Sequence, residues 1–216
     1  MFQDQHVVYL MGHLAVVAAT VQKILDVEIT WKIDGDGKIS FIMSVAKDEE
    51  FPALPRFGLR LFLNKKLENI CYFGMGPQES YRDKHQGSSH GYYRSNVSQM
   101  HEDYIRPQEN GSHYDCDYVE VANAHFGIIA VSEQPFSFNA SIYTQEELEQ
   151  AAHNYELTES DSTVLCIDHA LNGIGSNSCG PAVLKKYQFD DTAFQFGFTL
   201  VPFVKEQQVI AGNIQK

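Results

Sequence analysis

The sequence is poor in basic residues, with 16 Lys and Arg against 28 Asp and Glu, and its formal net charge is −12. Binding to phosphate-rich partners depends on clustered Lys and Arg, so this balance excludes a nucleic acid as partner. A neutral substrate or a protein partner fits the composition better.

Cysteine is also scarce, with only Cys71, Cys116, Cys166 and Cys179 in 216 residues. Their wide spacing matches neither a zinc site nor a redox motif, and so few cysteines predict free thiols rather than disulfides. Free thiols are typical of the cytoplasm, where we expect this protein.

No apolar run is long enough to cross a lipid bilayer. The longest, residues 7–19, is interrupted by His13, and the residues before it include Asp4 but no Lys or Arg. A secretory signal needs a positively charged leader, so we predict a buried strand here and no membrane association.

Strand patterns dominate the rest of the chain. Residues 27–31 and 39–45 alternate apolar and polar side chains around Asp34-Gly35-Asp36-Gly37, which predicts a β-hairpin. Further strands are expected at 57–63, 70–73, 114–121, 127–132, 164–170, 183–189 and 193–201, and a long irregular connection at 80–104. The pattern predicts a single all-β domain over residues 1–216, built as a large antiparallel sandwich.

One segment, residues 141–152, has helical character. Thr144 is placed as its N-cap and Glu147 as its capping-box partner, followed by good helix formers. We expect one short surface helix. The sequence has no alternation of strands and helices, so it does not encode a catalytic (β/α)-barrel.

Three loops rich in glycine, proline and polar residues occur in order at 74–83 (GMGPQESYRD), 107–111 (PQENG) and 173–181 (GIGSNSCGP). Together they resemble the C-terminal domain, or separate small chain, of the lactose-cleaving β-galactosidases of glycoside hydrolase family two, over roughly residues 31–203. The resemblance implies a galactose-mutarotase-like β-supersandwich that is shortened at its N-terminus. It also implies that the catalytic barrel lies elsewhere, either in the same polypeptide or in a large subunit.

A glycosidase acting alone needs two carboxyl groups flanking the scissile bond. The carboxyl candidates in irregular segments are Glu79, Asp83, Glu102, Asp103 and Glu109. For Glu79 and Glu109 we favour structural hydrogen bonds from loop N–H groups. The resemblance agrees, because it implies that the catalytic glutamates belong to the barrel and that this chain has no catalytic residue.

The same resemblance implies that residues 173–181 lean into the barrel's active site, which makes Asn177, Ser178 and Cys179 the candidate substrate-binding residues. Cys179 stands where some members present a tryptophan, and it offers no extended π face for a sugar.

No metal ligand is expected in this chain. His85, His90 and His101 lack the spacing of a metal site and are expected to be hydrogen-bonded loop residues. Magnesium and a monovalent cation are implied only for the complete enzyme.

Aromatic residues offer further binding candidates. Tyr81, Tyr92, Tyr93 and Tyr104 lie in or beside the irregular connection, where tyrosine commonly packs its ring and bonds its hydroxyl. Trp31, the one tryptophan, is expected to pack on the sheet.

The sequence therefore predicts a non-catalytic part of an oligomeric β-galactosidase that completes the active site of a barrel and acts on β-galactosides such as lactose. Two alternatives remain open at this point. One is a stand-alone carbohydrate-binding module, and the other is a mutarotase-like protein on the same fold.

Overall fold

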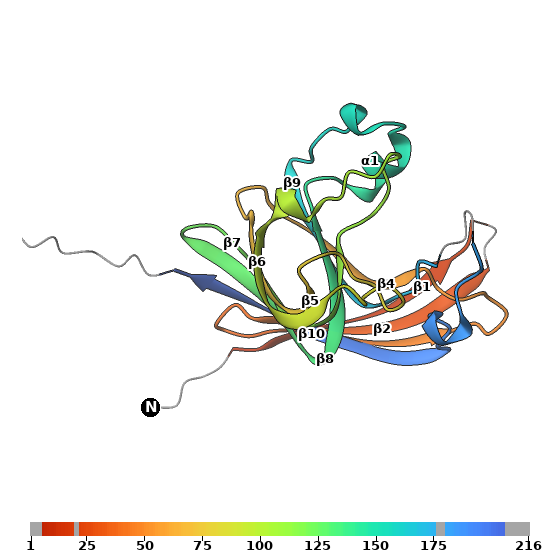
Figure 1. Cartoon of the computed structure of the whole chain (residues 1–216). Helices are drawn as coiled ribbons and strands as arrows, with labels where there is room; N and C mark the ends of the chain where they lie inside the picture. The colour runs from red at the N-terminus through yellow and green to blue at the C-terminus, as the bar shows by residue number, and fades with distance from the viewer. Residues whose placement is uncertain (1–5, 20–21, 176–179, 206–216) are drawn as a thin grey trace, which may run out of the picture.

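The computed structural model describes residues 6–19, 22–175 and 180–205. Within these residues, ten antiparallel strands form a continuous sheet that folds over on itself, and one short helix, α1 (Gln145–Gln150), lies outside it (Figure 1). The expected all-β antiparallel architecture is confirmed. None of the described helices is long and apolar enough to cross a membrane.

The strand bounds follow the chain in order. They are β1 Val8–Val17, β2 Lys23–Ile33, β3 Ile39–Lys47, β4 Arg56–Asn64, β5 Asn69–Gly76, β6 Ser89–Asn96, β7 Ser112–Ala122, β8 Phe126–Ser141, β9 Ser162–Leu171 and β10 Ala193–Val204. Three single-turn 3-10 helices complete the elements, at Val97–Met100, Asn154–Glu156 and Lys185–Tyr187.

The sheet divides at β8, which is long enough to serve both layers. Strand order along the main path is β1-β2-β3-β10-β8-β7-β5-β6, and β9 and β4 branch from β8. The first half of β8 pairs with β10 and its second half with β9. The branch folds back over the main path, so that Phe57 of β4 and His169 of β9 pack against Phe194 of β10, with ring centroids 5.1 and 4.7 Å apart.

The core lies between these layers. It is formed by alternate residues of β2, β3 and β10 on one side and by β4 and β9 on the other, and it continues between β5, β7 and β8. Tyr72, Phe136 and Phe138 are among its largest fully buried side chains. β9 carries six consecutive buried residues because both of its faces are covered.

Several local predictions are confirmed. The hairpin at 27–45 is β2 and β3, and Gly37 in its turn has a positive φ of 80°. The hydroxyl of Thr144 accepts the N–H of Glu147, as an N-cap should. The Glu147 carboxylate does not complete the expected capping box; it accepts from the N–H of Thr158 instead.

Three local predictions are wrong. Residues 7–19 form a strand but not a buried one, because β1 lies at the sheet edge with no second layer over it. Residues 183–189 form a 3-10 turn rather than a strand, since their backbone groups bond locally, as from Tyr187 N–H to the Leu184 carbonyl. The irregular connection at 80–104 contains β6, a strand of Ser, Gly, His and Tyr that pairs with β5.

Candidate functional site

The three loops singled out in the sequence meet in space. They line one hollow of about 350 Å³ that receives Glu79 and Tyr81 from the first loop, Glu109 from the second and Ile174 from the third. Tyr104, Asn139 of β8 and Asn172 complete much of its wall. Loops more than 90 positions apart in the chain therefore build one surface.

Glu79 is the central anion of this region. Its Oε1 accepts from the Lys84 ammonium at 2.7 Å and from the Tyr104 hydroxyl. Its Oε2 accepts from the Tyr81 hydroxyl and from the N–H of Gly111, each at 3.0 Å. The prediction that Glu79 receives a loop N–H is confirmed.

These four donors decide the charge of Glu79. Burial disfavours the charged carboxylate, but the hydrogen bonds from Lys84, Tyr104 and Gly111 outweigh burial and lower the pKa of Glu79 below its ordinary value. A general acid must hold a proton near neutral pH, whereas this carboxyl gives its proton up early. Glu79 therefore ties two loops together rather than donating a proton.

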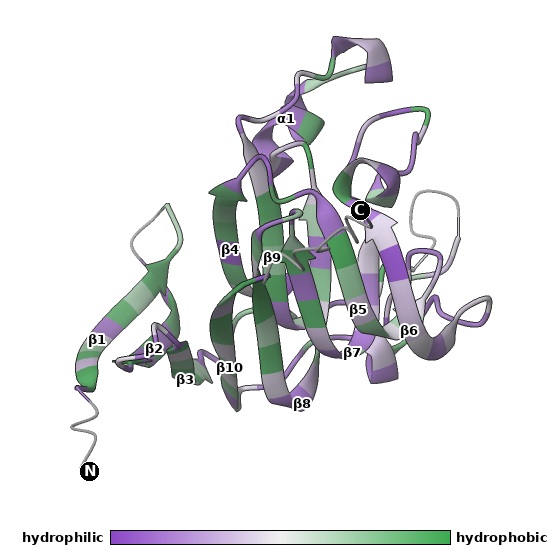
Figure 2. Ribbon diagram, turned by 90° about the vertical axis from the view of Figure 1, so that its left-hand side faces the viewer, coloured by the Kyte–Doolittle hydropathy of each residue, from purple (hydrophilic) through white to green (hydrophobic). Residues whose placement is uncertain are grey.

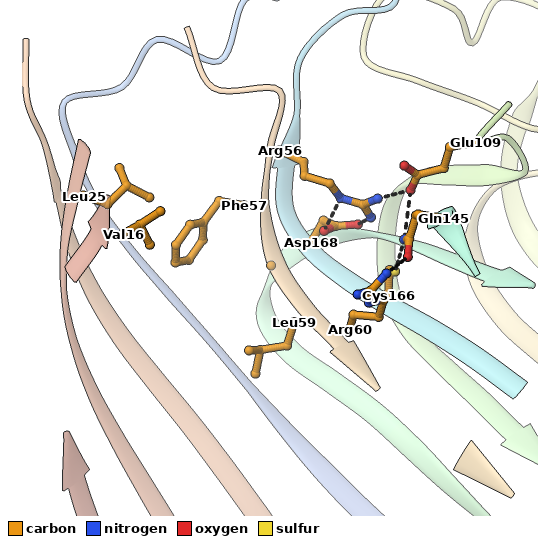
Figure 3. A pocket seen from close by; sticks show the side chains of 11 residues that line it. Val16, Leu25, Arg56, Phe57, Leu59, Arg60, Glu109, Gln145, Cys166 and Asp168 are labelled. Carbon is orange, nitrogen blue, oxygen red and sulfur yellow. Dashed lines mark hydrogen bonds and ion pairs between the residues drawn. The ribbon is translucent and has the colours of Figure 1, made fainter. Parts of the chain in front are cut away.

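A second charged group lies beside the hollow, at the start of β4. The Arg56 guanidinium donates from Nε to Oδ1 of Asp168 at 3.1 Å and from Nη2 to Oδ2 of the same carboxylate. Its Nη1 donates to Glu109 Oε1, which also accepts from Gln145 (Figure 3). Glu109 thus accepts from side chains, and the expectation that it accepts from loop N–H groups is wrong.

Asp168 is the buried member of this pair, with its side chain only 3% exposed, while the Arg56 side chain is 24% exposed. Burial raises the pKa of Asp168 to about 6, although Arg56 opposes this rise. Burial alone would lower the pKa of Arg56, and the Asp168 charge reverses this and raises it. Through its bonds to Asp168 and Glu109, Arg56 links β4, β9 and the second loop.

Asp83, from the first loop, fixes the start of the third loop. Its carboxylate accepts the N–H of Ile174 at 3.0 Å and the N–H of Gly175 at 2.7 Å. Gly175 has a positive φ of 58°, a conformation that favours glycine. The N–H of Gly173 adds a bond to the Tyr187 carbonyl. The predicted substrate-binding residues Asn177, Ser178 and Cys179 follow directly and lie outside the described residues.

The tyrosines behave as expected for ordered loops. Tyr81 is buried and Tyr104 is partly buried, and both hydroxyls bond Glu79. Tyr93 packs on Tyr72 and bonds Ser89, while the half-exposed Tyr92 bonds Arg94. Trp31 packs on Phe41 of the neighbouring strand at 4.8 Å.

The three histidines are hydrogen-bonded, as predicted, although His90 lies on β6 rather than in a loop. His85 bonds the Tyr81 carbonyl, His90 the Asp115 carbonyl and His101 the Asn110 side chain. Cys71, Cys116 and Cys166 are free thiols, and Cys179 lies outside the described residues.

Sequence reasoning missed Arg56 and Asp168, which stand 112 positions apart and have no local motif. It also missed His113, which is buried between Tyr72 and Phe138. Burial lowers the pKa of His113 to about 4. Of the three, only Asp168 gave a signal in the sequence, as a lone charged residue that follows the apolar run of β9.

Comparison with known proteins identifies relatives of this chain. A family model described as the β-galactosidase small chain matches residues 2–200. The β-galactosidase of Actinobacillus pleuropneumoniae is 45% identical over 199 residues, which cover 92% of this chain and 19% of that protein. The β-galactosidase of Staphylococcus xylosus is 35% identical, covering 92% and 20%, and that of Kluyveromyces lactis is 33% identical, covering 73% and 15%. This chain spans about a fifth of the length of the first two relatives.

Proposed function

Because this chain belongs to the β-galactosidase small-chain family, we propose that it is the C-terminal domain or the small subunit of a β-galactosidase. The complete enzyme would hydrolyse terminal β-D-galactosides such as lactose. The observation that carries the proposal is the extent of the match, since nearly all of this chain corresponds to only a fifth of its relatives. The remaining four-fifths supplies the larger, catalytic part.

The carboxylates near the hollow support the assignment of catalysis to the rest of the enzyme. Hydrolysis of a glycosidic bond needs two carboxyl groups with different protonation, one on each side of the bond. Glu79 is held ionised by four donors, and Asp168 is enclosed with Arg56. Glu109 is 40% exposed, but the Arg56 guanidinium binds it. Each therefore has a structural partner, and the reacting pair is assigned to the rest of the enzyme.

The contribution of this chain is to position the loop at residues 173–181. Asp83 and Tyr187 bond the N–H groups of Gly173, Ile174 and Gly175, so these three residues form a fixed base for the loop. In our proposal Asn177, Ser178 and Cys179 then approach the galactoside. Cys179 would pack beside the sugar, because a thiol cannot stack on it as an aromatic ring does.

Magnesium and a monovalent cation are assigned to the rest of the enzyme as well. Within the described ranges, no group of three His, Cys, Asp or Glu side chains is arranged to hold a metal ion. We also place the enzyme in the cytoplasm, in keeping with the free thiols Cys71, Cys116 and Cys166.

The test compares this chain alone with this chain co-expressed with the four-fifths of the A. pleuropneumoniae β-galactosidase that lies outside the match. We expect no cleavage of a chromogenic β-galactoside by the chain alone, and cleavage by the co-purified pair. Turnover by the isolated chain that Glu79→Gln or Glu109→Gln abolishes would overturn the proposal. Saturable binding of galactose or lactose to the isolated chain in calorimetry would instead indicate a carbohydrate-binding module.

A further inference from the structure

The first strand carries an apolar face that points in the same direction as the core. Directly paired residues of antiparallel strands project to the same side of a sheet. The register pairs Leu14 with Val27 and Val16 with Leu25, and both β2 residues belong to the core. The apolar side chains of β1 on this inner face are Val8, Leu10, Leu14 and Val16.

Exposure changes abruptly between β2 and β1. On the inner face, Met43 of β3 is 2% exposed and Val27 of β2 is 4% exposed, whereas Leu14 of β1 is 54% exposed. Val8, Leu10 and Val16 are exposed to a similar degree. The second layer of the sandwich therefore covers β2 and stops before β1, and Figure 2 shows β1 standing at the rim as a largely apolar strand.

The opposite layer ends at a second free strand. β4 pairs with β9 and, within the described ranges, with no other strand, so one of its edges is open. A cavity of about 400 Å³ lies where β4 approaches the end of β1. Its apolar wall is formed by Val16 of β1, Leu25 of β2, and Phe57 and Leu59 of β4 (Figure 3).

We infer that the inner face of β1 and the open edge of β4 accept extended apolar segments from the larger part of the enzyme, which complete the second layer. This inference rests on the proposed function. Added strands would bond the free N–H and C=O groups of β4 and cover the β1 side chains, as in β-strand addition. The relatives carry about four-fifths of their length outside this match, which leaves ample chain for these strands.

A second copy of this chain fits the surface less well. Each copy carries a formal net charge of −12, which opposes close association of two copies. One heterologous partner can satisfy both strands.

The experiment uses co-expression with the same four-fifths of the A. pleuropneumoniae enzyme and compares two variants of β1. Leu14→Asp puts a charge on the inner face, and burying it unpaired should weaken the complex roughly 100-fold and reduce co-purified activity. Met11→Asp is the matched control. Met11 is 83% exposed and pairs with Thr30 on the outer face, so we expect a change below about 2-fold.

The variants should fold, since Leu14 is already half exposed in the isolated chain. Circular dichroism and thermal unfolding check this. Hydrogen exchange provides a second readout that needs no variant, with slower exchange expected at β1 and β4 in the complex.

The outcomes separate the two proposals. The docking inference is overturned if the complex forms and is active, Leu14→Asp changes neither property, and hydrogen exchange at β1 and β4 is not slowed. That result leaves the proposed function standing. A wild-type chain that gives neither complex nor activity overturns both. A dimer of this chain that Leu14→Asp dissociates would show that a second copy occupies the face, and would overturn the choice of partner.

Discussion

Replacing Arg56 with methionine leaves the Asp168 carboxylate buried without its counterion. Methionine keeps much of the length of the arginine stem but removes both bonds to Asp168 and the bond to Glu109. Breaking one side of a buried ion pair typically costs about 3 to 5 kcal/mol of stability. At pH 8, we expect Arg56→Met to destabilise the chain by about 4 kcal/mol.

The pH dependence of this loss provides the sharper signature. The folded-state pKa of Asp168 is about 6, above its unfolded value of about 3.9. A carboxyl with a raised pKa holds its proton more tightly in the folded chain than in the unfolded one. Its contribution to the free energy of unfolding is therefore full below pH 4 and is lost as the pH rises through 6. At pH 4.5 Asp168 is mostly protonated in the fold, and removing Arg56 should cost only about 1 kcal/mol.

Urea unfolding followed by circular dichroism at pH 8 and pH 4.5 measures both values. With a slope of about 2.5 kcal/mol per molar urea, the expected midpoint shift at pH 8 is about 1.5 M. Arg60→Met is the matched control on the same strand. Its ion pair with Glu146 is exposed at 35% and 58%, so the loss should stay below about 1 kcal/mol. Equal losses for the two variants, or a loss for Arg56→Met that does not shrink in acid, would refute this reasoning.

Three further predictions concern the same region. Glu79→Gln removes the negative charge and replaces one of the two acceptor oxygens, which four donors share, with a donating amide group. It should cost about 2 to 4 kcal/mol in urea unfolding, and a loss below 1 kcal/mol would show that these bonds carry little stability. The folded-state pKa of His113, about 4, lies below its unfolded value, so its contribution is lost as the pH falls from 6.5 through 4. When the pH is lowered from 7 to 4.5, the free energy of unfolding of the wild-type chain should therefore fall by about 2 to 3 kcal/mol more than that of the His113→Gln variant. Equal falls would contradict the argument that burial keeps His113 neutral. Gly111→Ala would place a Cβ 2.2 Å from the Met100 carbonyl oxygen, at a residue whose φ is +69°. This strain should lower the melting temperature by roughly 6 to 12 °C. An unchanged melting temperature would show that the loop relaxes freely.

Local chemistry in the sequence predicted much of the fold. Asp34 to Gly37 predicted the hairpin because tight turns need positive φ, and Thr144 predicted the start of the helix because its hydroxyl caps a free N–H. The 89–96 strand escaped prediction because its Ser, Gly, His and Tyr residues show little apolar alternation. Pairing with β5, rather than its own propensity, makes this segment a strand.

The candidate site was predictable only in part. The three loops could be recognised one by one, but their meeting depends on pairings such as β4 with β9, which no local pattern encodes. The same limit applies to Arg56 and Asp168, whose side chains meet across that pairing. The burial predicted for residues 7–19 failed for a related reason, because burial of an apolar strand depends on whether another layer covers it.

The pairing of β3 with β10 affects how this chain is made as well as how it is held together. Ser40 and Thr199, which bond across these strands, stand 159 positions apart. At a synthesis rate of about 5 to 20 residues per second, roughly 10 to 30 s pass between the emergence of the two strands from the ribosome. During that interval the β2–β3 hairpin lacks β10, the neighbour on which Phe41, Met43 and Val45 depend for part of their burial in the finished fold. We therefore expect the nascent chain to be prone to aggregation until β10 emerges, and conditions that slow translation should lower the yield of folded protein.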